Sequence, residues 1–162
     1  MTIVTYQRDC LFGEIVNQEM ILNEYGRIAD KCWRAIPEHF PNVELGAHVV
    51  MPNHVHGIIV IIDNDRADAV ASARRGTIYR APTENIEQFR KPVKGSLPTI
   101  VRTYKAAVTR RIGRELNATG IWQRNYYEHI IRDEKDLQNK TDYIEANPSL
   151  WDEDDNNPQN VR

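Results

Sequence analysis

Two histidines separated by one valine, His54 and His56, precede an apolar run from Gly57 to Ile62. Successive side chains of a β-strand point to opposite faces, so both imidazoles project from one face, about 7 Å apart along the backbone. Two imidazoles held in this way on a rigid strand can bind one metal ion. Polar surface histidines and hydrogen-bonded core histidines are the alternatives, and the spacing alone leaves them open.

A tyrosine and an amide near the end of the chain form the second group. Tyr143 and Asn147 are four residues apart at the end of a predicted helix at 133–146, so they lie one turn apart on one face. Leu137 and Ile144 mark a different face, which is expected to pack on the core. The phenol and the amide can therefore point together toward a site outside the core, although a half-buried helical tyrosine is ordinary by itself.

Basic residues without an acidic one extend from Arg90 to Arg114, although the net charge of the whole chain is only −2. Apolar residues recur every three to four positions over 97–116, which predicts a helix. A solvated helix face is the alternative to a functional one, but such faces usually mix both signs of charge, so this composition favours phosphate binding. The candidate DNA-binding residues of this helix are Arg102, Lys105, Arg110, Arg111 and Arg114.

An aromatic and β-branched stretch at 121–132 is predicted to be the last strand. Trp122, Tyr126 and Tyr127 are candidates for stacking on bases, and Arg124 is a candidate for contacting a phosphate or a guanine edge. Packing within a strand explains the same residues equally well. The two tyrosines also compete with the helical tyrosine as nucleophiles, and they rank below it because a tyrosine at a helix edge can swing.

The composition bounds the class of protein. The chain has 162 residues, of which 41% are hydrophobic and 27% charged, enough for one core and too few for two ordinary domains. Its longest apolar run is too short to span a bilayer, and its start lacks the pattern of a secretory signal. Cys10 and Cys32 have no metal-ligand spacing and are interpreted as reduced thiols. We expect a cytoplasmic protein, associated with the nucleoid.

The order of the predicted elements indicates an α+β fold. An antiparallel sheet with helices packed on one face accommodates that order. We expect residues 1–151 to form a single domain, with 63–96 as a flexible loop or insertion and 152–162 as an acidic, disordered tail. The predicted strands lie at 1–10, 14–22, 43–51, 54–62 and 121–132, and the predicted helices at 23–36, 97–116 and 133–146.

Three segments together resemble the single-tyrosine HUH transposases, and most closely their REP-associated tyrosine transposase branch. The resemblance runs in order from Ile3 to about Trp151. The segments that carry it are Met51–His56, Trp122–Arg132 and Asp142–Pro148.

The resemblance implies a ferredoxin-like α+β fold with the HUH strand central in the sheet. It implies nicking and rejoining of hairpin-bearing single-stranded DNA through a covalent 5′-phosphotyrosine. By position, His54 and His56 match the metal ligands, Tyr143 the nucleophile and Asn147 a third metal ligand. Because these ligands are all neutral, we expect Mg²⁺ or Mn²⁺ to bind weakly until a DNA phosphate joins them. A homodimer and a monomer both remain open, and no membrane partner is expected.

Two other functions compete with nicking. A catalytically silent, hairpin-binding protein derived from such a transposase would explain the basic helix, but intact His54, His56, Tyr143 and Asn147 argue against decay. A metal-dependent hydrolase of small molecules would use the histidine pair. It would leave the basic helix without a purpose.

Overall fold

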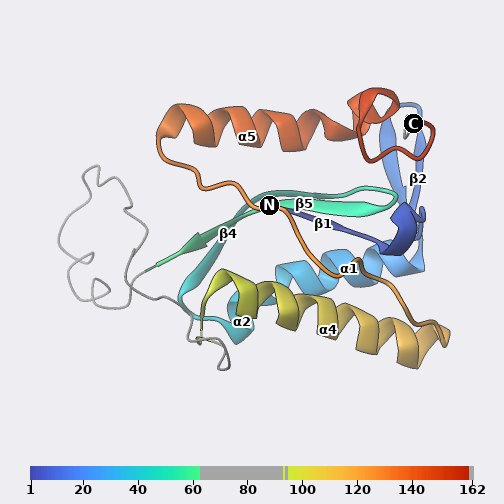
Figure 1. Cartoon of the computed structure of the whole chain (residues 1–162), viewed down its shortest axis with the longest axis horizontal. Coiled ribbons are helices and arrows are strands. Elements are labelled where there is room, and N and C mark those ends of the chain that lie inside the picture. Colours follow the sequence, from blue (N-terminus) through green and yellow to red (C-terminus); the bar gives the residue numbers. More distant parts are fainter. Residues whose placement is uncertain (63–92, 94, 161–162) are drawn as a thin grey trace.

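A computed structural model describes residues 1–62, 93 and 95–160. Its centre is a three-stranded antiparallel sheet in which β5 lies between β1 and β4 (Figure 1). The strand that begins with the histidine pair is therefore central, and the α+β class is confirmed. The loop or insertion expected at 63–96 lies almost entirely outside the described residues. The strands of this sheet are β1 (Thr2–Val4), β4 (Val43–Val50) and β5 (His54–Ile61).

One face of the sheet is covered by α1 (Glu24–Arg34), α2 (Ile36–His39) and α4 (Leu97–Leu116) (Figure 1). The side chain of Asn23 begins α1 by accepting a hydrogen bond from the Gly26 amide, as its N-cap position predicts. The fully buried Trp33 packs against Gly57 of β5, where an added Cβ would lie 2.1 Å from the indole ring. This close approach seats α1 on the central strand and requires glycine there.

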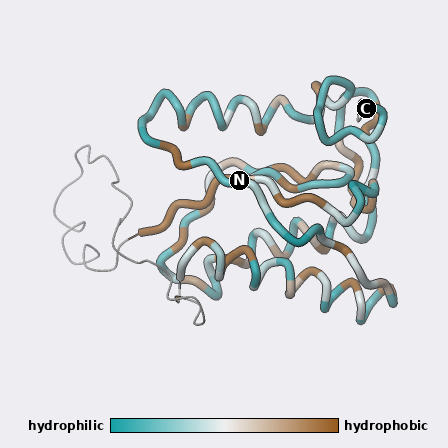
Figure 2. The backbone as a smooth tube through the Cα atoms, in the orientation of Figure 1, coloured by the Kyte–Doolittle hydropathy of each residue, from teal (hydrophilic) through white to brown (hydrophobic). Residues whose placement is uncertain are grey.

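The opposite face carries α5 (Glu134–Ala146), which begins at Asp133 as predicted (Figure 1). Helices therefore lie on both faces of the sheet, and the expectation that they pack on one face is wrong for α5. The cause lies in the sequence of this helix, which is mostly hydrophilic (Figure 2). Of its two expected core residues, Ile144 is buried and Leu137 is 40% exposed. With so little apolar surface, α5 covers a polar site.

The predicted strand at 121–132 is an interrupted one. The Gln123 amide still bonds the Val4 carbonyl, but the chain bends at Arg124, and Lys105 Nζ donates to the carbonyl oxygens of Gln123 and Asn125 at 2.7 Å each. The bend explains why a segment of strand composition forms no continuous ladder. Two isolated bridges connect it to β1 and the residue after it, Thr2 with Tyr127 and Thr5 with Trp122.

The extended piece expected at 14–22 is a hairpin of two strands, β2 (Gly13–Val16) and β3 (Glu19–Leu22), separate from the central sheet. Asn17 and Gln18 form its turn with φ of 51° and 66°, the left-handed conformations that tight hairpins require. A short 3₁₀ helix, η1 (Tyr6–Arg8), leads from β1 toward this hairpin. None of the helices among the described residues has the length and apolar character needed to cross a membrane.

The end of the chain packs back on the domain. After α5 the chain enters η3 (Asn147–Glu153), and beyond it Asp154 and Asn157 are 8% and 4% exposed. The predicted disorder of the acidic tail is therefore wrong for its described part, 152–160. Its polar side chains bond the local backbone, as when Asn157 Nδ2 donates to the Trp151 carbonyl at 3.0 Å. Acidic composition suggested a solvated tail, whereas these bonds fold it into turns.

Candidate active site

The histidine pair lies at the start of β5, facing α5. His54 is fully buried and His56 is 6% exposed, and their ring centroids are 4.5 Å apart. The Nδ1 atom of His54 is 2.9 Å from Asn53 Oδ1, and that of His56 is 2.8 Å from Thr2 Oγ1. Each ring thus uses one nitrogen for a protein partner, and the Nε2 nitrogens of both rings remain buried without a hydrogen bond.

Two oxygen atoms join these nitrogens. Asn147 Oδ1 and Asp154 Oδ2 are also buried and lack a hydrogen-bond partner. The carboxylate oxygen lies 3.8 Å from His54 Nε2, and the ligand atoms of His54, His56 and Asp154 all lie within 4.8 Å of one another. Leaving several polar atoms buried and unpaired is costly. A divalent cation would satisfy them together, so the donor set fits a metal ion.

The electrostatics keep the imidazoles neutral at neutral pH. Burial lowers the pKa of His54 to about 4. Burial, with the neighbouring His54, lowers the pKa of His56 to about 3. A neutral imidazole offers the lone pair that a metal ligand needs. The pair is thus set up to bind a cation rather than to act as a proton donor.

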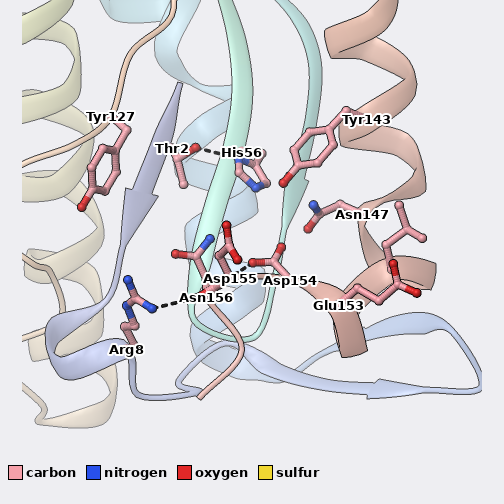
Figure 3. Close-up of a pocket in the computed structure, with 11 residues that line it drawn as sticks. Thr2, Arg8, His56, Tyr127, Tyr143, Asn147, Glu153, Asp154, Asp155 and Asn156 are labelled. Atoms are coloured by element: carbon pink, nitrogen blue, oxygen red, sulfur yellow. Dashed lines mark hydrogen bonds between the residues drawn. The ribbon is translucent and has the colours of Figure 1, made fainter. Parts of the chain in front are cut away.

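Tyr143 lies beside the pair at the mouth of an open pocket of about 520 Å³ (Figure 3). Its ring centroid is 5.4 Å from that of His56, and its side chain is 46% exposed. Partial burial, reinforced by the charge of Asp154, raises the pKa of the phenol. The phenol is therefore harder to deprotonate than a fully solvated one. Thr2, Arg8, Tyr127, Asn147 and Asn156 also line the pocket.

Comparisons with known proteins show which proteins this chain resembles in sequence and in fold. No protein-family model matches the chain. An uncharacterised protein of Haemophilus influenzae is 41% identical over 157 residues, which are 95% of this chain and 81% of that protein. A second H. influenzae protein, named "Putative REP-associated tyrosine transposase", is 32% identical over 128 residues, 78% of this chain.

A solved structure of a REP-associated tyrosine transposase bound to a REP hairpin has the same fold, with a TM-score of 0.59 over 93% of this chain and 20% identity. The chain is therefore similar to REP-associated tyrosine transposases in sequence and in fold. The family resemblance seen in the three sequence segments is thereby confirmed. The chain spans 61% of the named transposase relative and 65% of the solved chain.

The aromatic residues at 121–132 divide between the core and the pocket. Trp122 packs on Phe12 and Tyr104 with ring centroids 5.3 and 5.7 Å apart, and Tyr126 packs against the same core. Tyr127 is 65% exposed and lines the pocket with Tyr143 (Figure 3). Only Tyr127 of these aromatics therefore faces the site. Arg124 is exposed at the bend.

The basic residues of α4 are not brought to the site, because α4 covers the other face of the sheet (Figure 1). Lys105 is half-buried and donates to the Gln123 and Asn125 carbonyls, and burial lowers its pKa. Arg111 is partly buried beside Cys32. The remaining members are exposed, namely Arg102, Arg110 and Arg114.

Sequence reasoning missed several residues of the site, among them Asp154 and Arg8. Asp154 enters the metal-ligand cluster from beyond η3, and Arg8 reaches the pocket from η1, where its guanidinium donates to the Asp155 carbonyl at 2.7 Å. No spacing in the sequence signals either of them. The one available signal was the run of acidic residues at 152–155 shortly after the Tyr143 motif, which we interpreted as a solvated tail.

Proposed function

We propose that this chain nicks and rejoins single-stranded DNA at hairpin-bearing, REP-like sequences, with Tyr143 as the nucleophile. One observation carries the proposal: an accessible phenol shares a pocket with His56, Asn147 and Asp154, each of which has a buried polar atom without a partner. A fourth such atom, His54 Nε2, lies 3.8 Å from the Asp154 carboxylate. The named relative is a transposase, and the solved relative is bound to a REP hairpin. Both support DNA as the substrate.

The residues proposed to hold a divalent cation are His54, His56 and Asp154, with Asn147 as a fourth donor. The sequence predicted only neutral ligands, whereas Asp154 adds a carboxylate. The site therefore offers a negative charge that the predicted ligands lack. Oxygen donors suit Mg²⁺ and Mn²⁺, our proposed cofactors. A bound cation polarises the scissile phosphate and stabilises the charge that develops in the transition state.

The chain supplies the nucleophile, and the DNA supplies the phosphorus that is attacked. In the nicking step a bond forms between Tyr143 Oη and phosphorus while the bond from phosphorus to the 3′-oxygen breaks. The phenol proton passes to water in the open pocket, and the 3′-oxygen leaves as a hydroxyl after gaining a proton. The product is a 5′-phosphotyrosine, which keeps the DNA end covalently attached.

Rejoining reverses these changes. A 3′-hydroxyl attacks the phosphotyrosine, the bond between phosphorus and Tyr143 Oη breaks, and the phenol regains its proton. Because the phosphotyrosine link keeps the phosphodiester energy, no nucleotide cofactor is needed. Tyr127 and Arg8, which line the same pocket, are proposed to contact the strand by stacking and by charge.

The test is incubation with hairpin-bearing single-stranded DNA and Mn²⁺, followed by denaturing electrophoresis. We expect a protein–DNA adduct with the natural chain and none with Tyr143→Phe, while DNA affinity stays within a few-fold because only one oxygen is lost. Tyr127→Phe is the matched control and should keep the adduct. Hairpin binding without any adduct in the natural chain would instead support a catalytically silent DNA-binding protein. Loss of the adduct in Tyr127→Phe but not in Tyr143→Phe would identify Tyr127 as the nucleophile.

A further inference from the structure

Asn53 occupies the turn between β4 and β5, next to His54, and is fully buried. Its side chain makes three hydrogen-bond contacts. Asn53 Oδ1 lies 2.9 Å from His54 Nδ1, and Asn53 Nδ2 donates to the carbonyl oxygens of Arg8 at 2.9 Å and Asn156 at 2.7 Å. The contacts join β5 to the two segments that flank the pocket, η1 and the end of the chain.

The two carbonyl oxygens fix the orientation of this amide. If the amide were turned over, its oxygen would face the Arg8 and Asn156 carbonyls at hydrogen-bond distance with no proton between them. Asn53 Oδ1 must therefore face His54. An amide oxygen only accepts, so the proton of a neutral His54 ring has to lie on Nδ1.

We propose that Asn53 is a positioning residue that holds His54 in the Nδ1–H tautomer and so directs the lone pair of Nε2 into the cluster with Asp154. The side chain of His54 is fully buried and its Nε2 is 3.8 Å from Asp154 Oδ2. In the other tautomer this nitrogen would carry a hydrogen and could not bind a cation. The part of the proposal that concerns metal binding rests on the proposed function.

The second histidine has no equivalent constraint. His56 Nδ1 contacts the hydroxyl of Thr2 at 2.8 Å, and a hydroxyl both donates and accepts. Thr2 therefore leaves either tautomer of His56 available, whereas Asn53 selects one for His54. The difference makes His54 the ring whose protonation pattern should respond to a single neighbouring substitution.

The tautomer can be measured directly in the metal-free protein by long-range ¹H–¹⁵N correlation NMR of its histidine rings. We expect His54 to show the Nδ1–H tautomer in the natural chain. In Asn53→Leu, which removes the acceptor, the ring should move to the Nε2–H tautomer. An Nε2–H ring in the natural chain, which needs no variant to fold, would overturn the proposal.

Metal binding gives the second measurement, by titration with Mn²⁺ followed by electron paramagnetic resonance. Loss of a partner that orients a ligating histidine costs about 10–100-fold in affinity, which we expect for Asn53→Leu. The control is Asn23→Leu, because the Asn23 side chain likewise donates and accepts hydrogen bonds but lies at the start of α1, away from the histidine pair. It should keep the natural affinity and the His54 tautomer.

The two proposals fail in different ways. A natural chain that shows the Nδ1–H ring but binds no Mn²⁺ and forms no adduct would overturn the proposed function and leave the role of Asn53 in the tautomer intact. Adduct formation and Mn²⁺ binding that persist unchanged in Asn53→Leu would overturn the role of Asn53 and leave the proposed function intact.

Discussion

At the scale of single residues, missing hydrogen bonds distinguish the site from other buried polar groups. Thr5 and Asn53 are fully buried, and both make hydrogen bonds to the protein. In the part of the chain that the structure describes, five buried side-chain atoms lack a partner, and four of them belong to His54, His56, Asn147 and Asp154. Unpaired atoms at one point indicate a ligand rather than poor packing.

Asp154 is the only carboxylate of this cluster, so its substitution tests the ligand set. In Asp154→Asn we expect Mn²⁺ affinity to fall by about tenfold or more, equivalent to at least ~1.4 kcal/mol. The melting temperature of the metal-free protein should rise, because a buried, incompletely paired charge is removed. Calorimetric titration and thermal melting measure the two effects. Asp155→Asn, the exposed neighbour, is the control, and equal losses in both variants would exclude Asp154 as a ligand.

At the scale of elements, successive side chains of β5 point to opposite faces of the sheet, which separates the core residues from those of the candidate site. Gly57 faces the core side and accepts Trp33, while His54 and His56 face α5. α5 brings Tyr143 to the pair, and the turn into η3 returns Asp154 to it. The same division leaves α4 behind the sheet (Figure 1). Groups on α4 therefore cannot take part in the chemistry proposed for Tyr143.

The exposed arginines of α4 give a prediction that separates binding from catalysis. If Arg110 and Arg114 contact DNA phosphates away from the site, Arg110→Gln/Arg114→Gln should flatten the log–log salt dependence of single-strand binding by about 1.4. The rate of adduct formation at saturating DNA should not change, because both side chains lie on the other face of the sheet from Tyr143. Fluorescence anisotropy at several salt concentrations measures the first effect. An unchanged salt slope would show that this face only meets solvent.

At the scale of the whole molecule, local signals in the sequence predicted the elements, and long-range folding decided the site. Asn23 and Asp133 cap helices as their side chains predict, and the His-x-His pair begins a central strand. The side on which α5 packs could not be predicted, because its burial depends on a polar site rather than on an apolar stripe. Asp154 could not be predicted either, since only the turn after α5 brings it to residues about a hundred positions earlier.

The buried histidines also make the stability of the whole metal-free protein depend on pH. The folded pKa of His54 is about 4 and that of His56 about 3, against an ordinary 6.5. Between these values the unfolded chain binds more protons than the folded one, so stability is complete above pH 6.5 and is lost as the pH falls through this range. Each histidine contributes a slope of up to about 1.4 kcal/mol per pH unit.

His56→Gln removes one of these contributions. We expect the unfolding free energy of the metal-free variant, measured by urea denaturation, to fall less steeply than that of the natural chain between about pH 6 and pH 4, by roughly 1 kcal/mol per pH unit. Above pH 7 the two curves should run parallel, because His56 is neutral in both folded and unfolded chains, and this serves as the internal control. Equal slopes at low pH would mean that His56 accepts a proton in the folded protein as readily as in water. Such a ring would not be the desolvated, neutral ligand that the proposed metal site requires.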